Sequence, residues 1–169
     1  MTNGIRPATL DDSDFLVDCV QAMLADMQSY GGQPLAEFNH VKEWLKKYIE
    51  SWLVQEEHVF LLAVPDEVET QPVGMVEAYL TFPDEAFRQV RKLHVAAIYV
   101  RPERRHAGIG RSLLEAAIEW GRELGCEQVE LNVLAGNPAR RLYENMGFEV
   151  FEVQERMRIS CQPSVEEYQ

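Results

Sequence analysis

Two glycines and two arginines stand close together in the sequence, in a spacing that suits the binding of a phosphate group. The run is Arg105-x-x-Gly108-x-Gly110, with Arg111 directly after it. A helix begins with four backbone N–H groups that lack partners, and its dipole makes that end partly positive. Because glycine has no side chain, a phosphate can reach such amides directly, and arginine side chains can fork onto its oxygens. The spacing predicts a cradle for a diphosphate, here called the glycine loop (residues 105–111).

The segments on both sides of the glycine loop predict the elements that position it. Residues 95–100 are apolar and rich in β-branched types, as in a strand buried on both faces, and Pro102 has no N–H for a sheet ladder. After Gly110 the apolar residues recur at helical spacing. They are Leu113, Leu114, Ala117, Ile118, Gly121 and Leu124. The loop is thus expected between the end of a strand and the start of a helix.

Two other phosphate-binding loops fit this stretch less well. A Walker A loop needs a glycine and a lysine at the positions that hold Arg105 and Arg111. A dinucleotide-binding fingerprint needs a third glycine where the chain has Leu113. Both patterns fail at the residues that do the chemistry, so a nucleotide-binding domain of either kind is disfavoured.

The stretch does resemble the signature of the GNAT N-acetyltransferases, in which a strand, Arg/Gln-x-x-Gly-x-Gly/Ala and a helix hold the pyrophosphate of acetyl-coenzyme A. Residues 137–148 resemble the family's second coenzyme-side segment, an asparagine (Asn137) before a short helix that carries a tyrosine (Tyr143) and ends in Gly-Phe. The resemblance is strong over residues 73–159. It implies an α/β fold of the GNAT acyl-CoA N-acyltransferase type, with a mixed, mostly antiparallel central sheet, a splayed strand pair and about four helices.

The resemblance also implies which residues contact acetyl-CoA. The central strand would separate from its neighbour and expose backbone groups to the pantetheine arm, and one N–H would polarise the thioester carbonyl. Side chains of the same strand can still pack in the core. The implied coenzyme contacts are Ile98, Tyr99, Val100, Arg105, His106, Ala107, Gly108, Ile109, Gly110, Arg111, Asn137 and Tyr143.

The implied reaction is direct attack of a primary amine on the acetyl thioester. Tyr143 matches the family tyrosine at the coenzyme sulfur; it lies one helical step of ~100° from Leu142, which is expected to face the core together with Met146. A phenol there acts mainly as a hydrogen-bond donor to the thiolate, because its usual pKa of ~10 exceeds the ~8.5 of a thiol. His94 is the first candidate for the base that deprotonates the amine, since an imidazole titrates near neutral pH and serotonin N-acetyltransferase has a histidine at the matching place. Glu77, on the adjacent strand and acting through a water, is the second, unless it is only a solvated strand position.

Composition limits the partners. The 169 residues carry a formal charge of −12, so a nucleic-acid partner is not expected. Residues 101–111 are locally basic, with four arginines against one acid, whereas residues 1–57 hold ten acids against four basic residues. This distribution suits a polyanionic coenzyme and a cationic amine, although acidic surfaces also serve solubility. The amine acceptor is either a small molecule or a peptide. An aminoglycoside is not supported as the acceptor, because Ala96 stands where aminoglycoside-type enzymes tend to have an acid. The resemblance to the family is also compatible with a homodimer.

The remaining features describe an intracellular domain. No run is apolar and long enough for a membrane span, and no signal-peptide pattern is present. The three cysteines have no metal-like spacing, so no metal site is expected and a cytoplasmic location is favoured. One domain is expected over residues 1–160, with a loose tail over 161–169. An inactive GNAT-type domain that senses acyl-CoA is the alternative to an enzyme.

The pattern along the chain predicts the other elements. A first helix carries an apolar stripe between Phe15 and Met27, and a second covers about 39–53. By resemblance these two helices roof the acceptor site, where Tyr30, Phe38 and Trp44 are either acceptor contacts or core residues. Strands are expected over 5–8, 58–64, 73–80, 91–100, 127–134 and 148–159, and further helices over 108–125 and from Pro138 to a glycine cap at Gly147.

Overall fold

The computed structural model describes residues 4–32, 38–64, 71–82 and 90–156. Within them lie five strands and four α-helices, in nearly the order that the sequence predicts. The strands are β1 (Gly4–Pro7), β2 (His58–Val64), β3 (Gly74–Thr81), β4 (Lys92–Val100) and β5 (Gln128–Leu131). The α-helices are α1 (Ser13–Ser29), α2 (Phe38–Trp52), α3 (Ile109–Glu123) and α4 (Arg140–Asn145), and short 3-10 turns precede α1 and α3.

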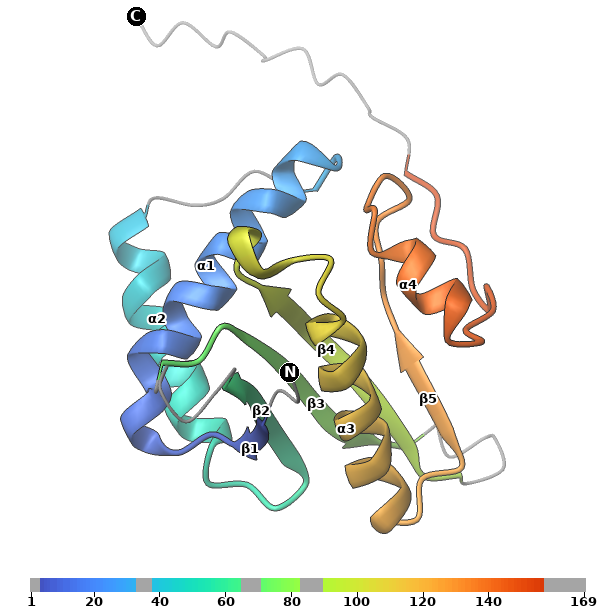
Figure 1. Cartoon of the computed structure of the whole chain (residues 1–169), viewed down its shortest axis with the longest axis horizontal. Coiled ribbons are helices and arrows are strands. Elements are labelled where there is room, and N and C mark those ends of the chain that lie inside the picture. The colour runs from blue at the N-terminus through green and yellow to red at the C-terminus, as the bar shows by residue number, and fades with distance from the viewer. Residues whose placement is uncertain (1–3, 33–37, 65–70, 83–89, 157–169) are drawn as a thin grey trace, which may run out of the picture.

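The sheet is mostly antiparallel and opens at one side. Its order is β1-β2-β3-β4-β5, and only β4 and β5 run parallel. Their ladder begins at Lys92 and Gln128 and ends where Val95 pairs with Leu131. Beyond that pair β4 continues to Val100 and the two strands diverge (Figure 1). The mixed sheet with a splayed strand pair is therefore confirmed.

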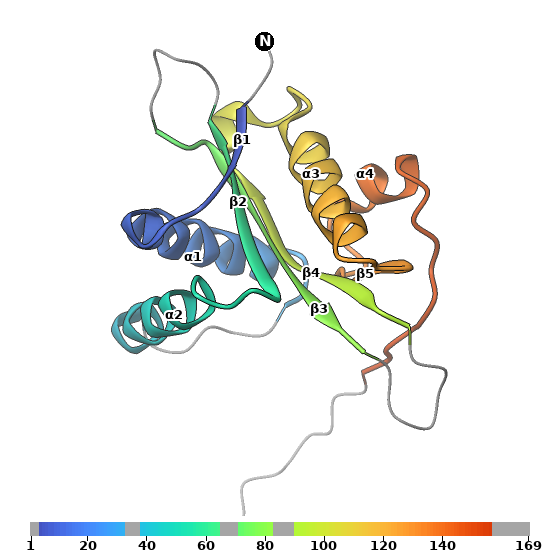
Figure 2. The ribbon, with the colours of Figure 1, turned by 90° about the horizontal axis from the view of Figure 1, so that it is seen from below.

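Helices cover both faces of the sheet. α1 and α2 lie on one face and α3 on the other, with α4 beside α3 (Figure 2). On α3 the buried positions include Ile109, Leu113 and Ala117, at the spacing of one helical face. The residues on the α1–α2 side form a second cluster, which contains Leu16, Ile49, Phe60 and Met75 among others. None of the described helices combines the length and apolar character needed to span a bilayer.

Two predicted strands differ from the structure. β5 ends at Leu131 instead of continuing to residue 134, because the diverging β4 leaves it no ladder partner beyond that point. The segment 148–156 begins with aromatic and β-branched residues that are typical of a strand, yet it forms no strand and Phe151 is 90% exposed. A strand needs a neighbour for its backbone groups, and this segment pairs with no described strand, although the outer edge of β5 is free among the described residues. The rest of that predicted strand, the tail 161–169 and the side chain of Phe38 lie outside the described residues.

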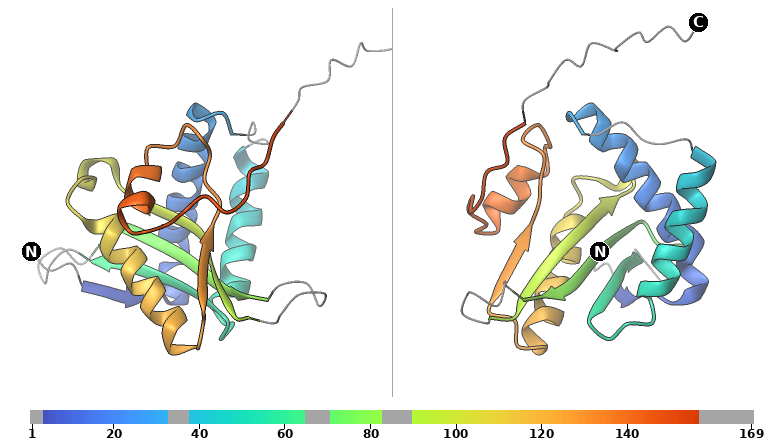
Figure 3. Two further views of the ribbon diagram at one scale, coloured as in Figure 1. Left: turned by 90° about the vertical axis from the view of Figure 1, so that its right-hand side faces the viewer. Right: turned by 180° about the vertical axis from the view of Figure 1, so that it is seen from behind.

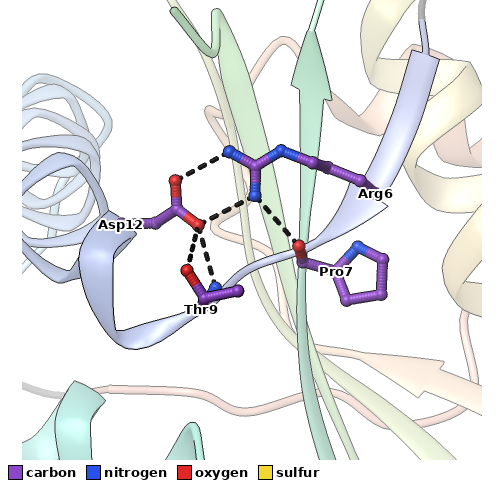
Figure 4. A network of polar contacts seen from close by, with 4 residues as sticks. All are labelled: Arg6, Pro7, Thr9 and Asp12. Carbon is purple, nitrogen blue, oxygen red and sulfur yellow. Dashed lines mark hydrogen bonds and ion pairs between the residues drawn. The ribbon is translucent and has the colours of Figure 1, made fainter.

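A compact polar network joins β1 to the start of α1 (Figure 4). Arg6 donates two hydrogen bonds of 2.8 Å to the carboxylate of Asp12, which also accepts hydrogen bonds from the backbone N–H and the hydroxyl of Thr9. The hydrogen bonds from Arg6 lower the pKa of Asp12 to about 2. This carboxylate therefore fixes the angle at which the chain leaves the sheet and enters the first helix.

Replacing Asp12 by asparagine is expected to lower the free energy of unfolding by about 1–2 kcal/mol at pH 7, because two charge-assisted hydrogen bonds are lost. The pKa of Asp12 is lowered on folding, so its contribution is complete above about pH 4 and disappears as the pH falls to about 2. Urea unfolding between pH 2 and pH 7 measures this. Asp11→Asn is the matched control on the exposed neighbour. Equal stability of Asp12→Asn and wild type at pH 7 would contradict the expectation.

Candidate functional site

The glycine loop presents a row of backbone donors. Six consecutive N–H groups, from His106 to Arg111, have no acceptor among the described residues. The first amide that bonds back into the helix is that of Ser112, to the carbonyl of Gly108 at 3.1 Å. His106 and Gly108 are both left-handed, with φ of 64° and 81°. Alternation of right- and left-handed residues makes concave arrays of N–H groups that suit anions.

Gly110 lies where the structure would also accept a small side chain. Its backbone is helical, and an added Cβ would meet only Leu142 Cδ2 at 3.5 Å and Val100 Cγ2 at 3.9 Å, which are ordinary contacts. Neither conformation nor packing requires glycine there, although glycine in a helix is about 0.5–1 kcal/mol less stable than alanine. Glycine and alanine therefore both fit at this position, as the glycine-loop signature allows, and the row of free amides is the observation that fits a diphosphate.

Arg105 is held more firmly than the sequence suggests. Its Nε donates to the carbonyl of Val100 at 2.9 Å, and its Nη2 donates to the carboxylate of Asp26, on α1, at 2.8 Å. The guanidinium also lies 5.5 Å from the centre of the Tyr99 ring. Arg111 is exposed and lies 3.4 Å from the carboxylate of Glu115. The basic part of the glycine loop is thus one anchored and one exposed arginine.

The open side of β4 presents alternate backbone groups. The N–H of Arg101 donates to Val73, on the side of β3. Because N–H groups alternate along a strand, Tyr99 faces β3 while Ile98 and Val100 face the gap left by β5. Two of the three predicted backbone contacts therefore point into the gap. The Tyr99 ring contacts Arg105 instead.

Tyr143 is buried, so the expectation that it turns away from the core is wrong. It is 8% exposed and belongs to the cluster that joins α3 to the sheet, whereas Leu142 and Met146 are only partly buried. The reason is that the six-residue α4 packs beside α3 and extends the core on that side. Among the described residues the phenol oxygen has no hydrogen-bond partner, and it is not one of the buried polar atoms that lack a partner, so it reaches the surface. Figure 3 shows α4 beside β5, at the open margin of the sheet.

Burial raises the pKa of Tyr143 to about 12. Proton transfer from such a phenol to a thiolate of usual pKa ~8.5 is uphill by about 5 kcal/mol. The side chain is therefore suited to donate a hydrogen bond and not to give up its proton. Asn137, at the start of the same segment, accepts a hydrogen bond from the N–H of Ala139 at 2.9 Å, and α4 begins at Arg140, two residues later than predicted. The left-handed cap at Gly147 is confirmed, with φ of 90°.

The candidate bases lie on the α1–α2 face of the sheet. His94 is half-buried, pairs with Tyr79 of β3, and its ring lies 5.0 Å from the Tyr79 ring. Glu77 is 4% exposed and is not the solvated residue that the sequence allowed. Its Oε1 accepts the hydroxyl of Tyr48 and contacts Nε2 of His58, each at 3.0 Å.

Sequence reasoning missed Tyr48 and His58 as partners of Glu77. The signal was a lone carboxylate in the otherwise apolar strand around residue 77, since a buried charge needs partners. Burial and the nearby Glu77 raise the pKa of Tyr48, so its hydroxyl stays protonated and remains a donor. Of the expected acceptor contacts, Trp44 is 61% exposed and stacks on Tyr48. Tyr30 is half-buried at the end of α1.

Comparison with known proteins agrees with this geometry. Residues 22–148 match the model of the Acetyltransferase (GNAT) family, and the chain belongs to this family. An uncharacterized N-acetyltransferase of Methanocaldococcus jannaschii is 30% identical over 154 residues, or 90% of this chain. The chain spans 63% of the length of that curated relative.

Two solved structures share the fold. The BH1408 protein of Bacillus halodurans, as a tetramutant, has a TM-score of 0.75 and 22% identity, with 92% of this chain and 99% of that one covered. A Clostridium acetobutylicum protein, named a predicted acetyltransferase and solved with acetyl-CoA, has a TM-score of 0.73 and 19% identity, with 93% and 96% covered. At these identities the likeness concerns the fold alone.

Proposed function

We propose that the protein transfers the acetyl group of acetyl-CoA to a primary amine by direct attack. The observation that carries this proposal is the row of six amides that have no acceptor among the described residues, in a chain of the GNAT family. The coenzyme supplies an activated acetyl thioester. In the transfer, the amine nitrogen bonds to the acetyl carbon, the C–S bond breaks with its electron pair going to sulfur, and the nitrogen loses protons.

The chain supplies binding and orientation. The amides of residues 106–111, with Arg105, hold the diphosphate, and Ile98 and Val100 offer N–H groups to the pantetheine arm and the thioester carbonyl. Asn137 fixes the start of the segment that carries Tyr143, and the Tyr143 hydroxyl donates to the departing thiolate. These roles need no side-chain proton transfer to sulfur.

The amine needs a proton acceptor, since an alkyl ammonium has a pKa of ~10.4. Glu77 pairs with Ala97, the residue next to Ile98, and adjacent strands lie about 4.8 Å apart. His94 precedes Ile98 by four residues, or about 10–13 Å along the strand. Glu77, acting through one water, is therefore the nearer proton acceptor, and His94 remains the other candidate.

Tyr143→Phe is expected to lower kcat about tenfold and to change the Kd for CoA less than twofold, because one hydrogen bond to a developing charge is lost. Stopped-flow thiol release and calorimetric CoA binding measure the two effects. Phe148→Leu, in contact with the Tyr143 ring, is the packing control. An unchanged kcat with the best amine would remove the proposed role.

Thiol release from acetyl-CoA with a panel of amines tests the function. The panel contains diamines, arylalkylamines, aminoglycosides, and peptides with a free N-terminus or lysine. A transferase releases CoA in proportion to acetylated amine. Binding of acetyl-CoA without release for any amine would instead favour the sensor, and no binding at all would reject both.

A further inference from the structure

We propose that Asp26 is a positioning residue for the coenzyme diphosphate, acting through Arg105. This inference rests on the proposed function, since it concerns the same phosphate site. Asp26 lies on α1, in the layer that covers the opposite face of the sheet from α3, and 79 positions before its partner in the sequence. No sequence motif links the two residues; only the folded chain brings them together.

Three contacts fix the Arg105 guanidinium. Val100 accepts from Nε at 2.9 Å, Asp26 accepts from Nη2 at 2.8 Å, and the Tyr99 ring lies 5.5 Å from the guanidinium carbon. Among the described residues Nη1 has no acceptor. The guanidinium is therefore held with one nitrogen left for a ligand, on the residue that directly precedes the row of free amides beginning at His106.

The ion pair between Asp26 and Arg105 contributes little to the free energy of folding. The side chains of Arg105 and Asp26 are 34% and 43% exposed, and an ion pair at that exposure contributes little to folding. Its larger effect is to hold the Arg105 side chain in one conformation. A free arginine side chain has many rotamers, and fixing it before the ligand arrives removes that cost from binding.

A carboxylate beside a diphosphate also repels it, so the two effects of Asp26 must be separated. Asparagine keeps an oxygen that accepts from Nη2 but carries no charge. Alanine removes both the oxygen and the charge. If Asp26 positions Arg105, replacing Asp26 by alanine weakens CoA binding and replacing it by asparagine does not. If Asp26 instead competes with the diphosphate for Arg105, both variants bind CoA more tightly.

The test is calorimetric binding of CoA to the full chain at low salt. We expect the Kd of Asp26→Ala to rise about fivefold and that of Asp26→Asn to stay within about twofold of wild type, or to fall. Pantetheine, which has no diphosphate, serves as the second ligand and is expected to bind wild type and Asp26→Ala equally. Asp18→Ala, which removes an exposed α1 carboxylate paired with Lys42, is the matched control.

Each outcome decides the proposal. An unchanged or lower Kd for Asp26→Ala overturns it, and so does equal weakening by alanine and asparagine or a matching loss of pantetheine binding. Failure of the wild-type chain to bind CoA rejects the proposed function itself. Normal CoA binding by wild type with no effect at Asp26 rejects only the positioning role. Circular dichroism confirms that each variant is folded.

Discussion

Replacing Glu77 by glutamine is expected to lower kcat/KM about 100-fold near neutral pH, the low end of the usual effect of a proton acceptor. Glutamine keeps an oxygen for the bonds to Tyr48 and His58 but accepts no proton. The loss is expected to shrink as the pH rises, because a growing fraction of the amine is then already neutral. Measuring kcat/KM from pH 6 to pH 10 with one amine gives both results.

Two further variants make this measurement decisive. Glu130→Gln removes a carboxylate from the neighbouring region of the sheet, where it pairs with Lys92, and is expected to leave the profile unchanged. His94→Gln is expected to cost less than Glu77→Gln. If His94→Gln gives the larger, pH-dependent loss while Glu77→Gln remains active, His94 is the base and Glu77 serves only to tie α2 and β2 to β3.

Gly110→Ala is expected to stabilise the protein and to preserve coenzyme binding. The free energy of unfolding should rise by about 0.5 kcal/mol, because alanine is the better helix former and its Cβ meets no close contact. The Kd for CoA should stay within about threefold of wild type, because the glycine-loop signature accepts alanine at this position and the added Cβ lies against the side chains of Leu142 and Val100.

A gain of stability without a loss of CoA binding is the expected result of this experiment. Thermal unfolding without ligand and calorimetry with CoA measure them separately. Ala116→Gly, further along α3, is the reverse control and is expected to lower stability while leaving the Kd for CoA within about twofold. A Kd for CoA that rises about tenfold or more in Gly110→Ala would contradict this expectation.

Most of the fold was predictable because its elements have strong periodicity. The limits of β2 agree with the structure residue for residue, α2 differs from its prediction by one residue at each end, and β4 differs by one residue at its start. The helical spacing of apolar residues predicts α3, and Gly108 and Pro102 indicate where this helix begins and where β4 ends. The separation of β4 from β5 was not predictable from periodicity. Only the family resemblance implied it.

The errors have a common cause in long-range packing. Helical geometry predicts that Tyr143 and Leu142 lie on different sides of α4, but it does not predict which of these sides faces the core. The Glu77 pairings with Tyr48 and His58, and the Arg105 pairing with Asp26, join residues between 19 and 79 positions apart. Such contacts follow from the arrangement of layers, which a single sequence does not specify residue by residue.

The outer margin of β5 affects how the molecule behaves in concentrated solution. Among the described residues β5 pairs only with β4, so part of its hydrogen-bonding capacity faces outward. The chain also exposes the apolar side chains of Val150, Phe151 and Val153 after α4. Unpaired strand edges and apolar surface are the features through which like molecules adhere. High concentration is therefore expected to favour association of copies of this chain through these surfaces, and dilution to favour the single chain.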